Sequence, residues 1–404
     1  MTDQRSQLEL PGEESITSDD FYSRQTTKEI LATTALYGPW KPDGTFDWES
    51  YENLVRTVMR SGSVPATNVD TTWAIYNNWH LTKELIWRTA EIALQEQQHI
   101  AEDRPLMVAG LNTNSMDIEA GQIAPALRDQ LKEIDAGFRK RRMNRIRYMP
   151  VPDRRLYHAP SRVKISIHRE IGRVIGEFTQ FGMVFFELDI GIKGFGSNYS
   201  PREIESILAE TPEIQEYKSA IISKKMNLAY PYDMRADLLR IRIIESVAAD
   251  RVQFSTGNDW FISLARCGKH IKNFGYLLGA SQMSPNLFKR WRDAVMQHNP
   301  EGLALEHDLQ AAAKDFWTPG NVGIYRHYLA IFLAMTGIIS HPLPHPNCEP
   351  RYRVKPEDYF VSLKHAVRLG LVPPEEIQSI VRNLIPGCAD WTEDAIRRRV
   401  EWLG

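Results

Sequence analysis

Four short polar segments follow apolar, strand-like runs, and their residue types could carry out chemistry. They are 70–72 (Asp-Thr-Thr), 187–189 (Glu-Leu-Asp), 218–219 (Lys-Ser) and 255–259 (Ser-Thr-Gly-Asn-Asp). A lysine can form an imine with a carbonyl compound, while carboxylates and hydroxyls can move protons or bind the substrate. This combination predicts covalent catalysis on a carbonyl compound, provided that the fold brings the four segments together.

Lys218 is the candidate nucleophile among the lysines. A lysine attacks a ketone only as the neutral amine, and a water-poor place such as the inside rim of a barrel favours that form. Lys218 follows the apolar Ile214, and we expect it to emerge at the end of a strand. The alternative is a solvated surface lysine, as most lysines are. Lys193 lies too far before the seventh predicted strand to compete, and Lys224 and Lys225 are typical of a solvated turn.

Alternating strands and helices are expected to position these segments. From about residue 28, short apolar runs alternate with longer stretches of helical periodicity, a pattern typical of a parallel sheet covered by helices. The predicted strands are 29–36, 66–69, 105–111, 145–151, 183–188, 214–217, 252–255 and 274–278, and the predicted helices between them include 48–61, 83–95, 165–181, 201–210 and 234–249. Eight strands can close a (β/α)8 barrel, whose chemistry lies at the carboxyl ends of the strands.

The chain is expected to have three parts. A polar tail covers residues 1–27, the (β/α)8 barrel covers 28–283, and a C-terminal helical region packed on the barrel covers 284–404. Predicted helices at 286–296, 303–316, 323–338 and 356–369 make up most of this appendage, and a terminal helical extension follows from residue 373.

Composition limits the partners and the compartment. With 404 residues and a formal net charge of −2, the chain has no general attraction for nucleic acid or an anionic membrane. The three cysteines, Cys267, Cys348 and Cys388, are too few and too widely spaced for a disulfide framework. The N-terminus has no signal-peptide pattern, and no apolar run is long enough to span a bilayer. We therefore expect a cytoplasmic protein.

An ordered series of motifs resembles the dihydrodipicolinate synthase and N-acetylneuraminate lyase family. Residues 43–48 (D-G-T-F-D-W) are similar to the family opening D-G-x-I-D, and 109–115 (A-G-L-N-T-N-S) to A-G-x-G-x-N-S. Residues 212–218 (P-E-I-Q-E-Y-K) resemble the strand N-I-x-G-I-K, and the similarity continues through 275–285 and 337–344. It covers about residues 28 to 372. The resemblance implies a barrel enzyme without a cofactor, a Schiff-base lysine at Lys218, a pyruvate-like 2-keto acid substrate and a homotetramer.

The resemblance also suggests where the substrate carboxylate binds. The family motif G-T-T-G-E binds it through hydroxyls and backbone amides, and Thr71 and Thr72 match its threonines, whereas Asp70 does not match its first glycine. The alternative is a threonine pair that caps the following segment. Gly257 and Asn258, after the seventh strand, are further substrate-binding candidates.

The fifth strand departs most from the family pattern. Its proton-shuttling tyrosine in Y-N-x-P is absent, and we assign Glu187 as the replacement catalytic residue, since a carboxylate on a barrel rim can act as acid and base. A salt-bridged rim residue is the alternative. Tyr148 is a further catalytic candidate and Tyr157 a secondary one, because both flank the fourth strand.

Two other clusters have alternative interpretations. The arginine-rich run 139–155 could bind a phosphate or polycarboxylate, or it could form a solvated face or a subunit contact. His341, His345 and Cys348 have a spacing that a metal could use, but the intervening prolines favour an extended loop, so no metal site is expected.

The sequence as a whole predicts a Schiff-base lyase or aldolase that acts on a 2-keto acid or related ketone by aldol cleavage, condensation or dehydration. The alternative is a non-catalytic barrel that binds a small ligand or serves as a regulatory subunit, because the family tyrosine is missing and the G-T-T-G-E motif is altered.

Overall fold

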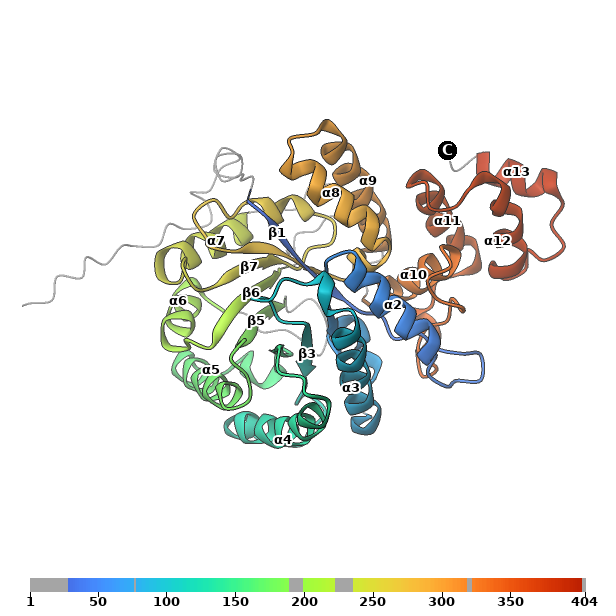
Figure 1. Ribbon diagram of the computed structural model, residues 1–404. Helices are drawn as coiled ribbons and strands as arrows, with labels where there is room; N and C mark the ends of the chain where they lie inside the picture. Colours follow the sequence, from blue (N-terminus) through green and yellow to red (C-terminus); the bar gives the residue numbers. More distant parts are fainter. Residues whose placement is uncertain (1–27, 76–77, 189–198, 222–234, 318–321, 402–404) are drawn as a thin grey trace, which may run out of the picture.

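The chain folds into a closed barrel of eight parallel strands surrounded by helices, followed by further helices on one side (Figure 1). The computed structural model describes residues 28–75, 78–188, 199–221, 235–317 and 322–401. The strands are β1 (Ile30–Ala35), β2 (Val64–Thr67), β3 (Met107–Leu111), β4 (Ile146–Pro150), β5 (Met183–Leu188), β6 (Ile214–Ala220), β7 (Gln253–Thr256) and β8 (Phe274–Leu278), and they pair in sequence order. The predicted (β/α)8 barrel with a C-terminal helical appendage is confirmed.

Helices connect the strands on the outside of the barrel. They are α2 (Trp48–Arg60), α3 (Trp79–Gln95), α4 (Ile123–Arg141), α5 (Ser161–Gly176), α6 (Pro201–Glu210) and α7 (Arg235–Val247). Local sequence fixes several of their starts. The Asp47 side chain accepts a hydrogen bond from the Ser50 amide at the start of α2, and Ser200 and Glu203 form a reciprocal capping box around Pro201 at the start of α6.

Strand register decides which side chains point into the barrel. Lys218 of β6 pairs with Phe186 of β5 and with Ser255 of β7, so these three residues form one layer. A β-bulge between Met183 and Val184 shifts the β5–β6 register by one residue, because Met183 pairs with Ile214 whereas Val184 pairs with Glu216.

Two strands differ from the predicted bounds in a way that matters for the site. β2 begins at Val64, includes Pro65, which pairs with Thr34 of β1, and ends at Thr67. Asp70 therefore lies beyond the strand, in a short 3-10 helix, η2 (Asp70–Ile75). β6 continues to Ala220, so Lys218 lies within the strand and not after it. The regular alternation of a strand therefore fixes the direction of the Lys218 side chain.

The C-terminal helices begin as part of the barrel wall and then extend to one side (Figure 1). They are α8 (Pro285–Met296), α9 (Pro300–Trp317), α10 (Val322–Met335), α11 (Tyr359–Arg368), α12 (Ile377–Leu384) and α13 (Glu393–Glu401). Phe288 and Trp291 of α8 pack on Tyr276 of β8. The next helices contact the strand ends, since Tyr325 and Arg326 of α10 hydrogen-bond to loops after β7 and β2.

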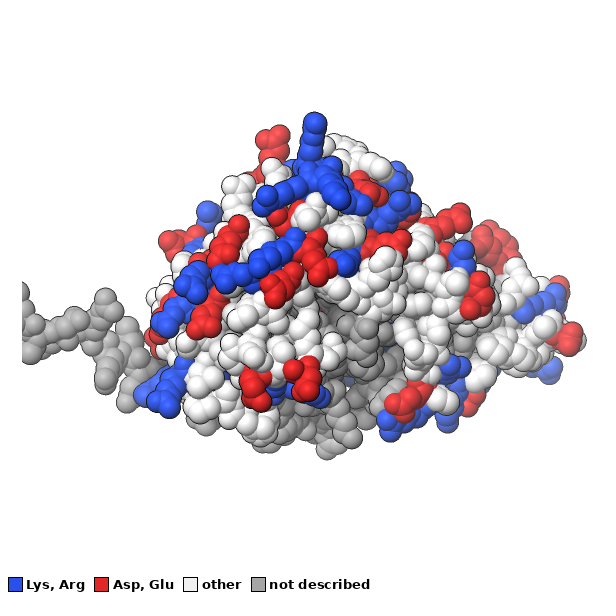
Figure 2. All heavy atoms as spheres, turned by 90° about the horizontal axis from the view of Figure 1, so that it is seen from below, with Lys and Arg blue, Asp and Glu red and all other residues white. Residues whose placement is uncertain are grey.

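The surface carries charges of both signs. Figure 2 shows lysine and arginine side chains interleaved with aspartate and glutamate on the face it presents. Among the described residues, no helix is both long enough and apolar enough to cross a membrane.

Candidate active site

Lys218 lies inside the barrel and makes an ion pair with Asp70. Its Nζ is 3.0 Å from Asp70 Oδ1, and the Lys218 side chain is 3% exposed, compared with 25% for Asp70. The same Nζ lies 3.9 Å from the centre of the Phe186 ring. The predicted nucleophile is thus a buried amine that contacts one carboxylate and one aromatic face.

Gly257 gives the Lys218 side chain its space. A Cβ atom at Gly257 would lie 2.9 Å from Lys218 Cε and 2.8 Å from the backbone oxygen of Ser219, closer than real Cβ contacts. The Gly257 amide also donates to the Ser219 carbonyl. Gly257 therefore lies next to Lys218, where the missing side chain lets the loop after β7 approach β6.

Asn258, the other candidate in this loop, contacts the outer side of the barrel. Its Nδ2 donates to Asp237 Oδ2 of α7 at 2.9 Å, and its backbone amide donates to the Thr256 hydroxyl. These contacts give Asn258 a structural task away from the Lys218 ammonium.

The hydroxyls of the predicted carboxylate cradle donate to the backbone. Thr71 Oγ1 donates to the Leu36 carbonyl at 3.0 Å, and Thr72 Oγ1 donates to the Val69 carbonyl at 2.9 Å. Both threonines are buried. Each hydroxyl proton is thus already used within the chain. These bonds also differ from those of a cap, in which the hydroxyl oxygen accepts from a backbone amide.

A second carboxylate, Asp259, belongs to the same end of the barrel. Its Oδ2 accepts a hydrogen bond from the Tyr325 hydroxyl at 2.8 Å and its Oδ1 accepts one from the Ala280 amide at 2.7 Å. Burial raises the pKa of Asp259 to about 6, against the lowering effect of these hydrogen bonds and of the nearby Lys218 charge. Burial and Asp259 together keep the pKa of Tyr325 well above its ordinary value.

Tyr325 brings the C-terminal helices into this site. A Cβ atom at Gly279 would meet both the Tyr325 hydroxyl, at 2.7 Å, and Thr71 Cγ2, at 2.8 Å, so these two groups lie close together. Neither Tyr325 nor the acid–base potential of Asp259 was predicted from the sequence. The Tyr325 ring stacks on Trp317 at 4.5 Å between centroids, which makes an aromatic wall.

Glu187 does not lie beside Lys218, and its predicted role as the relay does not fit the geometry. Its carboxylate accepts hydrogen bonds from Arg240 at 3.0 and 3.1 Å and from the Tyr217 hydroxyl. Arg240 belongs to α7, and Tyr217 precedes Lys218, so both contacts lie on the helix-facing side of the sheet. In the structure, Glu187 is therefore a salt-bridged residue, as in the alternative interpretation.

The β-bulge between Met183 and Val184 explains why Glu187 lies on the helix-facing side of the sheet. Without it, Met183–Ile214 pairing would continue in step and would put Glu187 opposite Lys218. With it, Phe186 takes that place and Glu187 pairs with Ser219. The β5 side chain next to the amine, that of Phe186, is therefore apolar and has no proton to transfer.

The predicted tyrosines also lie away from the amine. Tyr148 pairs with Ala109 and Met183 and is fully buried, its hydroxyl has no hydrogen-bond partner in the described structure, and burial raises its pKa far above the ordinary value. Its neighbour in β4, Arg147, is the residue that points inward, where it pairs with Glu216 at 2.7 Å. Tyr157 lines a groove with Lys164, Glu203 and Arg240.

A buried polar network lies behind Lys218, between β6, β7 and α7. Asp237 of α7 accepts hydrogen bonds from the hydroxyl of Ser219 and from Asn258, close to the Glu187–Arg240 pair. Burial raises the pKa of Asp237 to about 7. Because Tyr217 and Ser219 both belong to this network, the strand residues on each side of Lys218 are held in place.

The arginine-rich run 139–155 is largely used within the fold. Arg139 pairs with Asp135, Arg141 with Glu91 and Arg155 with Asp153, and Arg145 donates to the carbonyls of residues 101 and 104. These arginines are therefore engaged within the chain, whereas the sequence suggested an anion site, a solvated face or a subunit contact. Within the described ranges, no three histidine, cysteine or acidic side chains form a group that could hold a metal.

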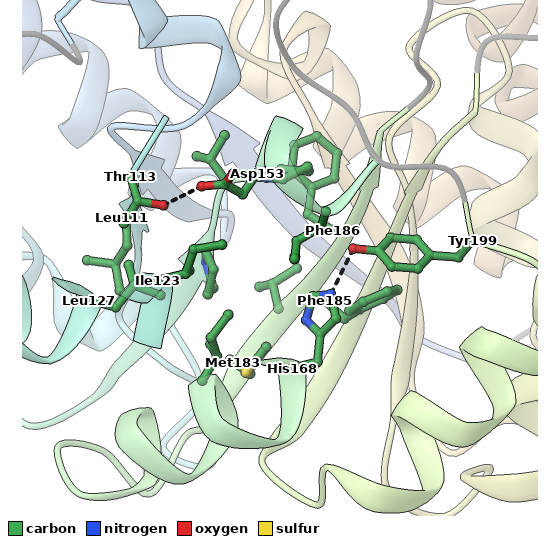
Figure 3. A pocket seen from close by; sticks show the side chains of 16 residues that line it. Leu111, Thr113, Ile123, Leu127, Asp153, His168, Met183, Phe185, Phe186 and Tyr199 are labelled. Atoms are coloured by element: carbon green, nitrogen blue, oxygen red, sulfur yellow. Dashed lines mark hydrogen bonds between the residues drawn. The ribbon is translucent and has the colours of Figure 1, made fainter. Parts of the chain in front are cut away.

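A small enclosed cavity lies outside the barrel, between β3–β5 and helices α4 and α5 (Figure 3). It has a volume of about 20 Å³ and a mainly apolar lining, with polar groups already paired as Thr113–Asp153 and His168–Tyr199. This is room for about one water molecule. The cavity is therefore not a substrate site, and the groups around Lys218 remain the candidate.

Comparison with solved structures gives the same overall architecture at low sequence identity. A monomeric dihydrodipicolinate synthase variant is 18% identical with a TM-score of 0.61, and the match covers 86% of this chain and 98% of that one. Dihydrodipicolinate synthase from Thermotoga maritima is 17% identical over 85% of this chain and all of that one, with a TM-score of 0.60. The enzyme from Bacillus clausii is 14% identical over 84% and 97%, with a TM-score of 0.61.

These similarities extend over most of the chain and show a shared fold. Neither a protein-family model nor a curated protein matches the sequence.

Proposed function

We propose that this chain is a divergent member of the dihydrodipicolinate synthase and N-acetylneuraminate lyase family, and that Lys218 forms a Schiff base with a small carbonyl substrate. The motif series and the fold shared with dihydrodipicolinate synthases support the family assignment. The single observation that carries the chemistry is the burial of the Lys218 amine inside the barrel, at 3.0 Å from a carboxylate.

The expected reaction is aldol cleavage, condensation or dehydration of a 2-keto acid or a related ketone. The Lys218 amine adds to the carbonyl carbon, and loss of water gives an iminium that draws electrons from the neighbouring carbon. The Phe186 face and the buried surroundings exclude water from the nitrogen. Gly257 leaves the space that the lysine stem needs.

A homotetramer is part of the same proposal, because it is usual in the family that the motifs resemble. The monomeric variant among the similar structures makes the assembly worth testing separately. Static light scattering of the purified full chain should give four times the chain mass, and a monomer at all concentrations would remove this part of the proposal.

A non-catalytic, ligand-binding barrel is the competing function, and Phe186 is the observation that favours it. Phe186, the register partner of Lys218 on β5, cannot transfer protons, and the hydroxyls of Thr71 and Thr72 donate to the backbone. A barrel of this kind would still bind a ligand, but it would not form a covalent bond with it.

Reductive trapping separates the two functions. Incubation with pyruvate and borohydride should add one reduced pyruvate per chain in the parent and none in Lys218→Arg. Lys164→Arg is a matched control, since Lys164 is also buried and also paired with a carboxylate, that of Glu203. If the parent gains no mass with pyruvate or with neutral ketones, or if Lys218→Arg is trapped equally, the Schiff-base function is wrong.

A further inference from the structure

We propose that Asp70 is the acid–base residue of imine formation at Lys218, a role that rests on the proposed function. Imine formation needs a group that takes a proton from the nitrogen and delivers one to the departing oxygen. The family resemblance does not supply such a group here, because Asp70 stands where the motif has a glycine and the shuttle tyrosine is absent.

Position and exposure suit Asp70 for this task. Its Oδ1 lies 3.0 Å from Lys218 Nζ, within the range for direct proton transfer. The lysine side chain is 3% exposed and the aspartate side chain 25%, so the carboxylate connects a buried amine with the solvent side. Protons can then enter and leave the site through Asp70 while the amine stays dry.

The backbone around Asp70 is held on two sides. Arg326 of α10 donates to the Asp70 carbonyl, and the next residue, Thr71, donates its hydroxyl proton to Leu36. A side chain on a fixed backbone can keep the geometry that proton transfer requires. The helical appendage thus contributes to the position of the carboxylate.

Among the residues that the structure describes, the other acid–base groups near the site are already engaged or face away. Glu187 pairs with Arg240 on the helix side of the sheet, and Phe186 carries no acidic proton. Asp259 accepts hydrogen bonds from Ala280, Tyr325 and Trp317. In the described part of the chain, Asp70 is the carboxylate in direct ion-pair contact with the Lys218 nitrogen.

The proposed step balances as follows. The neutral Lys218 amine forms a bond to the carbonyl carbon, the carbonyl oxygen takes up a proton from solvent, and Asp70 accepts a proton from the nitrogen to leave a neutral carbinolamine. Asp70 then returns that proton to the carbinolamine hydroxyl, the carbon–oxygen bond breaks, and water leaves. The nitrogen lone pair forms the carbon–nitrogen double bond of the iminium, next to the ionised Asp70.

If Asp70 were only an electrostatic partner of Lys218, its substitution would change the rate of imine formation in the opposite direction. If Asp70 only held the ammonium in its charged form, Asp70→Asn would leave more neutral amine and would speed addition to the ketone. If Asp70 moves protons, the same substitution slows imine formation. The direction of the change therefore distinguishes the two roles.

The test is the rate of pyruvate trapping with cyanoborohydride in the full chain. We expect Asp70→Asn to slow trapping by about 10²- to 10⁴-fold, the range for a lost acid or base, with the adduct still on Lys218. Asp70→Glu, which keeps a carboxylate, should recover at least about tenfold of this loss. Asp153→Asn is the matched control, because Asp153 is also a carboxylate paired with a cation, Arg155, beyond a strand end, and its trapping rate should stay within a few-fold of the parent.

Each outcome decides between the claims. Unchanged or faster trapping in folded Asp70→Asn overturns the role of Asp70 and leaves the Schiff base intact, and equal rates in Asp70→Asn and Asp70→Glu also count against it. Absence of trapping in the parent overturns the proposed function, and this inference with it. Far-ultraviolet circular dichroism and thermal unfolding confirm that the variants compared are folded.

Discussion

The Lys218 ammonium nitrogen lies 3.9 Å from the centre of the Phe186 ring, and the two residues are register partners on adjacent strands. The ring presents its electron-rich face to the nitrogen and shields it from water. A cation over an aromatic face contributes about 0.5–2 kcal/mol, depending on its desolvation. This contact is therefore a feature of the site that can be measured by itself.

A double-mutant cycle tests the contact between these two side chains. Phe186→Leu and Lys218→Met, singly and together, should give a coupling of about 0.5–2 kcal/mol in the free energy of unfolding, measured in urea. Phe185→Leu is the control for the cycle, because Phe185 packs against His168 and Tyr217 on the other side of the sheet. A coupling as large with Phe185 as with Phe186 would contradict the assignment of the two faces.

Glu187 should matter for stability and little for chemistry. Glu187→Gln removes one ionised partner of a buried ion pair, and breaking such a pair typically costs about 3–5 kcal/mol of unfolding free energy. At a temperature where the variant is folded, trapping at Lys218 should stay within a few-fold of the parent. A loss of about 100-fold in the trapping rate with unchanged stability would restore Glu187 as the relay.

The network behind Lys218 should make stability depend on pH. Burial raises the folded-state pKa of Asp237 from 3.8 to about 7, with Arg240 and Glu187 as its charged neighbours. Between these two values the folded state holds a proton that the unfolded state has lost, so the contribution of Asp237 to stability falls as pH rises from about 4 to about 7.

Asp237→Asn removes this titration. The unfolding free energy of the variant minus that of the parent should rise from pH 4 to pH 8, by a few kcal/mol at most. Both free energies are measured by urea denaturation. A difference that is constant over this range would show that the carboxyl of Asp237 is not held protonated in the folded state.

The charge of Asp70 should also influence which ketones react. An ionised carboxylate at 3.0 Å from the nucleophile repels a carboxylate next to the substrate carbonyl. Pyruvate carries such a carboxylate and hydroxyacetone does not. We expect Asp70→Asn to raise the ratio of pyruvate to hydroxyacetone trapping rates by about tenfold, equivalent to about 1.4 kcal/mol. An unchanged ratio would mean that other groups neutralise the substrate carboxylate.

Most of the barrel could be predicted from the sequence because its strands are short apolar runs between amphipathic helices. Strand β5 and helix α6 have the predicted bounds, and capping residues such as Ser200 and Glu203 mark the helix start directly. Lys218 could also be singled out, since its place in an ordered motif series does not depend on the exact strand bounds. Its burial and its contact with Asp70 required the folded structure.

The side of the sheet on which Glu187 lies depends on strand register, which a single strand sequence does not contain. Alternation along β5 separates Glu187 from Phe186, but only the pairing with β6 tells which of them faces Lys218. The β-bulge in this pairing puts Phe186, and not Glu187, opposite Lys218. Asp70 follows the second predicted strand, but it departs from the G-T-T-G-E motif that would mark a role there. Tyr325 lies over a hundred residues from Lys218, in a helix with no motif signal.

The most direct test of the account is to locate the reduced adduct in the sequence. After treatment of the full chain with pyruvate and borohydride, proteolysis and fragment mass spectrometry should place one added group on the side chain of Lys218, and the peptide that contains Lys164 should be unmodified. Prior conversion of Lys218 to Arg should remove the adduct. An adduct on any other lysine, or no adduct with pyruvate or hydroxyacetone, would contradict the assignment of Lys218 as the Schiff-base residue.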